Sequence, residues 1–300
     1  MFDFLYPPMR WHDWKDRWPL AACSAFVQSG DLCWHVQRMG QGPVMLLLHG
    51  TGSSSHSWRE LMVRWAHTHT VVSLDLPGHA FTGMADSAHL SLPGMARAVQ
   101  ALMHSLSLEP KVIVGHSAGA AVGAEMVLLG GPKPPALVAF NPAWMPMPGW
   151  AGWLFAPVAK LVTLNPLSGW LMARPSARSR RVEQLLLGTG SHLTPEGVHW
   201  YQVLFAQAVH VRGVLSMMER WDLASWSPRL EALGSPVLIV CGQDDRMVDP
   251  DSTQALSRRL PRVQYEVWPG LGHLAHEEAP ARCAQRVSDW LLSLPSETAH

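Results

Sequence analysis

The nine residues from Lys111 to Gly119, K-V-I-V-G-H-S-A-G, constrain the fold of this chain more than any other stretch. A β-branched run stops at two glycines that flank Ser117, and small residues follow. A strand that turns at once into a helix holds its apex residue in a strained conformation, and side chains two positions away would collide with neighbouring backbone. Gly115 and Gly119 meet that requirement, so the pattern predicts a nucleophile elbow. The alternative is a glycine-flanked turn with an ordinary serine, which the flanking strand and helix disfavour.

The residues after the turn, A-G-A-A-V-G-A-E-M-V-L-L, are first small and then apolar, which predicts a helix packed tightly beneath it. The N-terminus of such a helix points backbone N–H groups and a positive dipole end at the place where an oxyanion would form. A partner donor is expected from the loop His49–Gly52, which follows an apolar predicted strand at residues 44–48. We therefore predict an oxyanion hole formed by the backbone N–H groups of Thr51 and Ala118.

A serine hydroxyl is a poor nucleophile at neutral pH and needs a base, which a carboxylate holds in the right tautomer. Of the 16 histidines, His273 alone lies in a glycine-rich loop after the last predicted strand, where it can approach the elbow closely. We predict His273 as the base. His276, three residues later, is expected at the surface or behind the base.

The acid is expected in the loop after the preceding predicted strand, where Asp244 and Asp245 are adjacent. The third residue after the strand-ending Gly242 is the usual position, which selects Asp245 and leaves Asp244 as the alternative. The resulting chain order is serine, aspartate and then histidine. Asn141 cannot act as an acid, and Asp75 is expected to be a structural carboxylate that anchors the turn after it.

Predicted strands and helices alternate along most of the chain, which demands the α/β fold class, a mainly parallel sheet with helices on both faces. Strands are expected at residues 32–38, 44–48, 70–75, 111–114, 136–140, 236–241 and 263–268. Helices are expected at residues 57–67, 91–106, 118–129, 252–260 and 278–292.

The alternation stops at Asn141 and resumes near Pro236, and the stretch between them is rich in proline, glycine, tryptophan and helical patterns. This break predicts a helical insertion in a single α/β core, whose two parts complete one sheet. The predicted segments are residues 1–141 as the first part of the core with an N-terminal arm at 1–30, residues 142–230 as a helical cap, and residues 231–300 as the second part of the core.

The charge composition argues against a nucleic-acid partner. Lys+Arg and Asp+Glu are equal at 23, the formal net charge is zero, and no basic run is interleaved with aromatic residues. The motif H-E-x-x-H is absent and the four cysteines are scattered without a C-x-x-C pair. We therefore expect neither a metal site nor a bound cofactor.

The N-terminal sequence has acids and prolines where a signal peptide needs a continuous apolar stretch, and no later stretch is apolar for long enough to span a bilayer. These features predict a cytoplasmic protein without a transmembrane segment. Trp11, Trp14 and Trp18 could anchor a short amphipathic segment in peripheral contact with a membrane, although packing against the domain is the expected use.

With the motifs H-G-T-G, D-L-P-G-H, G-H-S-A-G and G-L-G-H-L-A-H-E-E in place, the chain resembles the capped α/β-hydrolase superfamily along nearly its full length. Several segments further resemble a branch found with bacteriochlorophyll biosynthesis genes, the magnesium-chelatase accessory proteins. These segments are Trp34–Val44, His49–Arg59, Ser91–Ala98, Leu164–Leu167, Gly188–Ser191 and Met217–Leu223. Ala80 departs from the family, whose D-x-P-G-H-G turn has glycine there, and we expect this to affect the turn and not catalysis.

The resemblance implies a serine hydrolase linked to photosynthesis, yet magnesium insertion is not acyl transfer. The first interpretation is an esterase that cleaves an ester or thioester on or near the tetrapyrrole pathway. The second is a tetrapyrrole-binding accessory protein that assists magnesium chelatase without hydrolysis, and the third is a scaffold that contacts the chelatase subunits.

The predicted cap holds seven tryptophans and several methionines, which could line a large, flat-walled apolar pocket for a tetrapyrrole or could form the core of the cap. His192, His199 and His210 could ligate a central magnesium, but lone histidines on a lid are more typical of the surface. The aromatic and sulfur residues are Trp144, Trp150, Trp153, Trp170, Trp200, Trp221 and Trp226, with Met145, Met147, Met172, Met217 and Met218.

Overall fold

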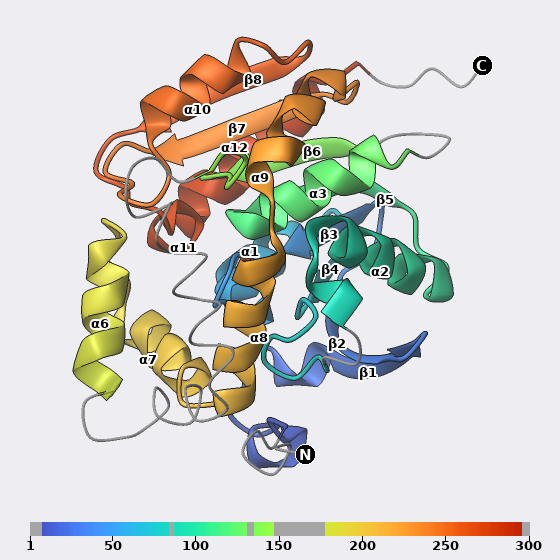
Figure 1. Ribbon diagram of the computed structural model, residues 1–300. Helices are drawn as coiled ribbons and strands as arrows, with labels where there is room; N and C mark the ends of the chain where they lie inside the picture. Colours follow the sequence, from blue (N-terminus) through green and yellow to red (C-terminus); the bar gives the residue numbers. More distant parts are fainter. Residues whose placement is uncertain (1–7, 84–86, 131–134, 147–177, 296–300) are drawn as a thin grey trace.

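The computed structural model describes residues 8–83, 87–130, 135–146 and 178–295 of the chain (Figure 1). Its centre is one eight-stranded sheet with the order β1-β2-β4-β3-β5-β6-β7-β8. The strands are β1 (Ser24–Ser29), β2 (Leu32–Met39), β3 (Val44–Leu48), β4 (Thr70–Leu74), β5 (Pro110–His116), β6 (Ala136–Phe140), β7 (Val237–Gly242) and β8 (Val263–Trp268).

The sheet is mainly parallel, as the alternation of strands and helices predicted. All neighbouring pairs from β4 through β3 to β8 are parallel, whereas β2 pairs antiparallel with both β1 and β4. The assignment of residues 1–30 to an N-terminal arm was wrong for Ser24–Ser29, which forms β1. This strand lies at the sheet edge with one neighbour and is nowhere fully buried, so its sequence lacks the apolar run of a central strand.

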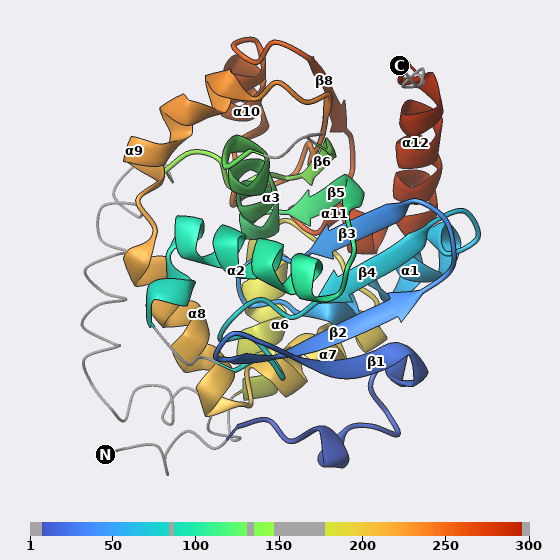
Figure 2. The same ribbon diagram turned by 90° about the vertical axis from the view of Figure 1, so that its right-hand side faces the viewer.

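Helices cover both faces of this sheet (Figure 2). The helices of the described residues are α1 (Arg59–Trp65), α2 (Leu92–Ser105), α3 (Ala118–Leu128), α6 (Arg178–Gly188), α7 (Pro195–Leu204), α8 (Ala208–Arg220), α9 (Leu223–Trp226), α10 (Pro250–Ser257), α11 (Ala275–Glu278) and α12 (Pro280–Ser293), of which α2 and α3 pack on one face and α1 and α12 on the other. Short 3₁₀ helices are η2 (Trp11–Asp13), η3 (Ala21–Cys23), η4 (Ser55–Trp58), η5 (Ser87–Leu90) and η7 (Ser227–Ala232).

Two apolar cores separate the helices into layers. Because side chains alternate along a strand, Leu46 and Leu48 of β3 pack in the core with α2 and α3. Met45 and Leu47 face the other way, into the core with α1 and α12. The sheet is therefore buried on both faces, which is the environment that a parallel sheet requires.

The segment between β6 and β7 contains α6 to α9 and η7, and no strand lies in its described parts, residues 141–146 and 178–236. It packs on the loops at the carboxyl ends of the parallel strands. A Cβ added at Gly190 would lie 1.9 Å from the carbonyl oxygen of Asp244, in the loop after β7. A Cβ added at Gly213 of α8 would lie 1.9 Å from the carbonyl oxygen of Gly78, after β4. These contacts are backbone against backbone. The boundaries of the cap at residues 142 and 230 stay a prediction.

The N-terminal tryptophans pack inward. Trp18 is 3% exposed, and its ring makes edge contacts with Phe81 and with Trp200 of α7. Trp11 is half-buried against Phe81, and Trp14 is half-buried against the same apolar cluster. All three tryptophans therefore pack against the domain, which is the use expected from the sequence. Within the described residues no helix is long and apolar enough to cross a membrane.

Candidate active site

Ser117 lies at the sharp turn from β5 into α3, with φ 51° and ψ −115°. The two flanking glycines are sterically required. A Cβ added at Gly115 would lie 2.4 Å from the backbone of Ala120, and one at Gly119 would lie 2.0 Å from the carbonyl oxygen of Leu48. The strained serine and the close helix beneath it form the elbow that the sequence predicted.

The structure brings together the three side chains that the sequence singled out. His273 Nε2 lies 3.0 Å from Ser117 Oγ, and His273 Nδ1 lies 2.8 Å from Asp245 Oδ2. Each of the three residues is 8% exposed. An imidazole that donates from Nδ1 to a carboxylate leaves Nε2 free to accept the serine proton. The geometry is therefore suited to activating the Ser117 hydroxyl.

Four hydrogen bonds hold the Asp245 carboxylate. Oδ2 accepts from His273 and from Asn141 Nδ2 at 2.7 Å, and Oδ1 accepts from the backbone N–H groups of Met247 at 2.7 Å and Val248 at 2.9 Å. Donors on both oxygens leave the carboxylate one orientation. This arrangement supports the choice of Asp245 for the acid.

Asp244 and Asn141 differ from Asp245 in what they contribute. Asp244 is exposed, and its backbone N–H donates to Leu271 O at 2.9 Å. Asn141 is fully buried at the end of β6, and its amide also donates to Gly272 O at 3.3 Å. Sequence reasoning correctly excluded Asn141 as an acid but missed it as a partner of Asp245. The available signal was an asparagine directly after a strand, since asparagine tolerates the positive φ of 46° found there.

The loop His49–Gly52 lies beside the elbow. A Cβ added at Gly50 would lie 2.6 Å from His116 Nδ1 and 3.0 Å from Ser117 Cβ, so glycine permits this close approach. Neither the N–H of Thr51 nor that of Ala118 has an acceptor among the residues that the structure describes. Ala118 is the first residue of α3, where backbone donors have no partner within the helix. Both predicted oxyanion donors are therefore unpaired within the described residues.

Two further histidines lie behind His273. His116 Nε2 donates to His273 O at 2.9 Å, and its ring centroid lies 4.9 Å from that of His273. His276 is fully buried, with its centroid 4.3 Å from that of His116, so the surface alternative for His276 was wrong. Burial and the neighbouring His273 lower the pKa of His276 to about 3. Burial also lowers the pKa of His116 well below its usual value, so both rings are neutral at neutral pH.

Asp75 has the structural role that the sequence predicted. It is fully buried, and one oxygen accepts from the Ser55 N–H at 2.8 Å. The other oxygen accepts from His35 Nδ1 at 2.8 Å and from the Phe81 N–H at 3.3 Å. The carboxylate thus ties the turn after β4 to β2 and to η4.

The histidines considered as magnesium ligands are not gathered around one point. His192 and His199 are exposed, whereas His210 is buried with both ring nitrogens in hydrogen bonds to backbone atoms. Within the described part of the chain, no group of three His, Cys, Asp or Glu residues could hold a metal ion. All four cysteines are free.

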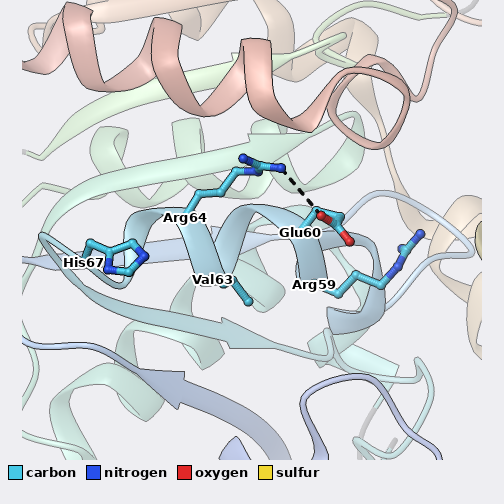
Figure 3. A pocket seen from close by; sticks show the side chains of 5 residues that line it. All are labelled: Arg59, Glu60, Val63, Arg64 and His67. Carbon is cyan, nitrogen blue, oxygen red and sulfur yellow. Dashed lines mark ion pairs between the residues drawn. The ribbon is translucent and has the colours of Figure 1, made fainter.

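An open groove of about 590 Å³ runs along the outer side of α1 and is separate from these residues (Figure 3). Its lining includes an ion pair between Arg64 and Glu60 at 3.9 Å, and no predicted site residue contributes to it. The lining residues are Arg59, Glu60, Val63, Arg64 and His67.

Residues 45–286 match the sequence profile of the alpha/beta hydrolase family, and the chain belongs to that family. It is 33% identical over 276 residues to a protein of Rhodobacter capsulatus named magnesium-chelatase 30 kDa subunit, covering 91% of this chain and 96% of that protein. It is 29% identical over 259 residues to the 2-hydroxy-6-oxo-6-phenylhexa-2,4-dienoate hydrolase of Burkholderia cepacia, covering 81% and 86%. Among solved structures, an esterase from Thermogutta terrifontis shares the fold at 22% identity and a TM-score of 0.71, covering 90% and 98%. Both levels of the resemblance are thereby confirmed.

Proposed function

We propose that this α/β-hydrolase is a serine esterase, with Ser117 as nucleophile, His273 as general base and acid, and Asp245 as the carboxylate that orients the imidazole. The observation that carries the proposal is the continuous hydrogen-bonded path from Asp245 through His273 to a serine at a strained elbow. A residue held in such a strained backbone conformation costs free energy, and residues of this kind cluster at active sites.

In this reaction Ser117 Oγ attacks the acyl carbon of an ester or thioester while His273 Nε2 takes the hydroxyl proton. The carbonyl oxygen becomes an oxyanion that accepts from the N–H groups of Thr51 and Ala118, each donor contributing about 3 kcal/mol to the transition state. The imidazolium returns its proton to the leaving alcohol or thiol. Water then attacks the acyl-enzyme with His273 again as base, which releases the acid and restores Ser117.

A fluorophosphonate probe should label the wild-type chain covalently, because the probe reacts with an activated serine hydroxyl. Ser117→Ala should abolish labelling together with turnover of p-nitrophenyl esters. The measurement is probe fluorescence on a denaturing gel, with Ser107→Ala as a matched serine control outside the site. Labelling that persists in Ser117→Ala would show that another serine reacts and would refute the assignment.

For the substrate, we propose an apolar, tetrapyrrole-like ester within bacteriochlorophyll and magnesium-tetrapyrrole biosynthesis. The support is the 33% identity to the protein named magnesium-chelatase 30 kDa subunit. The same relationship supports a second candidate, a tetrapyrrole-binding accessory protein that assists magnesium chelatase without hydrolysis, for which chelatase subunits would be partners.

The cap tryptophans weigh against the pigment pocket as far as they are described. Trp144 and Trp226 are buried in the core beside α2 and α3, and Trp200 is buried in the cluster around Trp18. Trp221 is half-buried and donates through Nε1 to Leu90 O at 3.0 Å. Core packing therefore accounts for these four residues. Trp150, Trp153 and Trp170 lie outside the described residues, as do Met147 and Met172.

Protoporphyrin or its magnesium form should quench the intrinsic tryptophan fluorescence saturably, with micromolar or tighter affinity, if the chain binds pigment. Free N-acetyltryptophanamide in the same titration corrects for light absorbed by the porphyrin. Binding by Ser117→Ala as tight as that of the wild type would favour the accessory role. Absence of saturable quenching in a chain that hydrolyses small esters would remove the pigment from both candidate functions.

A further inference from the structure

Histidine rings hold both polar backbone atoms of Gly52, the residue after the proposed oxyanion donor. The Gly52 N–H donates to His79 Nε2 at 3.3 Å, and Gly52 O accepts from His210 Nε2 at 3.2 Å. His79 Nδ1 donates to Pro77 O at 3.1 Å, and His210 Nδ1 accepts from the Ala80 N–H at 3.1 Å. Each ring donates once and accepts once, so each is neutral with a single tautomer.

The carbonyl on the other side of Thr51 is held as well. Gly50 O accepts from His49 Nδ1 at 2.8 Å and from the Ser53 N–H at 3.1 Å. Gly50 C=O and Thr51 N–H belong to one planar trans peptide, in which the two groups point in opposite directions. The bonds on Gly50 O therefore fix the direction in which Thr51 N–H points, and the bonds on Gly52 hold the loop directly after Thr51.

Of the three histidine rings at this loop, that of His210 comes from the inserted helices. His210 is in the first turn of α8 and fully buried, and Gly213 follows on the same helix face. The Gly213 backbone lies directly on Gly78, since a Cβ at Gly213 would lie 1.9 Å from Gly78 O. The next residues of that turn include Ala80, which has a positive φ of 44°. The position of His210 is thus set by how α8 lies on the core.

We propose that α8 positions the oxyanion loop through His210, so that His210 is a positioning residue for the acyl transfer. This inference rests on the proposed esterase function. It makes turnover depend on correct docking of an inserted helix, because a shift of α8 removes the bond that holds Gly52 O and loosens the loop that carries Thr51 N–H. Burial lowers the pKa of His210 to about 4, so the ring keeps its accepting nitrogen at neutral pH.

Two substitutions separate the two bonds of the ring. His210→Gln can place its amide N–H near the position of Nε2 and keep the donor to Gly52 O. His210→Asn reaches only the position of Nδ1, where its amide oxygen can accept from Ala80 N–H. We expect His210→Asn to lower kcat for a p-nitrophenyl ester about tenfold to hundredfold with little change in KM. We expect His210→Gln to retain most of the wild-type kcat.

Affinity for an arylboronic acid provides the readout that a merely structural role would not change. Its tetrahedral adduct with Ser117 places an oxygen at the oxyanion donors, so His210→Asn should weaken it by the same factor as kcat. Gly213→Ala, which removes no polar group, should act similarly by displacing α8. Equal kcat in wild type and His210→Asn, or equal losses in the Asn and Gln variants, would overturn the inference. A wild-type chain that neither hydrolyses esters nor reacts with fluorophosphonate would instead overturn the proposed function.

Discussion

Replacing Asp245 with asparagine should lower kcat for ester hydrolysis by about four orders of magnitude, or about 5.5 kcal/mol of transition-state stabilisation. Asp245 Oδ2 accepts from both His273 Nδ1 and Asn141 Nδ2. An amide nitrogen at that position would face two donors. To relieve this, the imidazole must take the other tautomer, whose Nε2–H points at Ser117 Oγ and cannot accept its proton.

Asp244→Asn is the matched control, because it makes the same chemical change at the adjacent, exposed residue. Its kcat should stay close to that of the wild type. The measurement is steady-state kinetics on one p-nitrophenyl ester, with thermal unfolding to establish that each variant is folded. A large loss in Asp244→Asn together with a small loss in Asp245→Asn would show that the acid is misassigned.

Acid should unfold this protein over a narrow pH interval below 6.5. Six histidines are fully buried and have their pKa values lowered from 6.5, burial being the first cause for each: His49, His56, His79, His116, His210 and His276. A lowered folded-state pKa means that the unfolded chain takes up the proton first. The stability is therefore complete above about pH 6.5 and is lost as the pH falls towards the folded-state values.

The expected loss of stability follows from the number of protons that the chain takes up when it unfolds. Each histidine contributes about 1.4 kcal/mol per pH unit once the unfolded ring is charged, so six contribute about 8 kcal/mol per unit. Glu277 acts in the opposite direction, because burial raises its pKa and the folded chain therefore takes up that proton before the unfolded chain does. Since a domain is typically stable by about 5–15 kcal/mol, one to two pH units below 6.5 should suffice for unfolding.

Urea denaturation at several pH values measures how steeply the free energy of unfolding changes with pH. His276→Met should reduce the proton uptake by about one and stabilise the protein at pH 5, because both His276 ring nitrogens lack a hydrogen-bond partner among the described residues. His199→Gln, at an exposed position, should leave the slope unchanged because water reaches that ring in both states. An uptake of one proton or fewer on unfolding between pH 6.5 and 5 would contradict the expectation.

Local sequence determines most of what could be predicted here. The elbow needs only Ser117 and its flanking glycines, and the central strands are apolar runs whose bounds differ from the prediction by at most two residues. The proximity of His273 and Asp245 to Ser117 could be predicted because parallel strands bring their following loops to one edge of the sheet. β1 was missed because an edge strand, half-exposed along its length, has no comparable apolar signal.

The residues that sequence reasoning missed act through contacts that span much of the chain. His210 meets Gly52 across 158 residues, and Asn141 meets Asp245 across 104. No periodicity records such a pairing, because the partners share neither a strand nor a helix. His276 illustrates the same point for burial: its polar side chain suggests the surface, and only the fold places it between His116 and Trp58.

One pairing in the sheet limits how early in synthesis the fold can be completed. Leu137 of β6 pairs with Val237 of β7, a hundred residues later, so the sheet cannot be completed until the inserted helices have been made. Closing so long a loop costs entropy before any contact rewards it, which places this pairing late in folding. A growing chain on the ribosome thus carries the proposed nucleophile well before its acid and base. A chain cut short before β7 would hold Ser117 with no means of activating it.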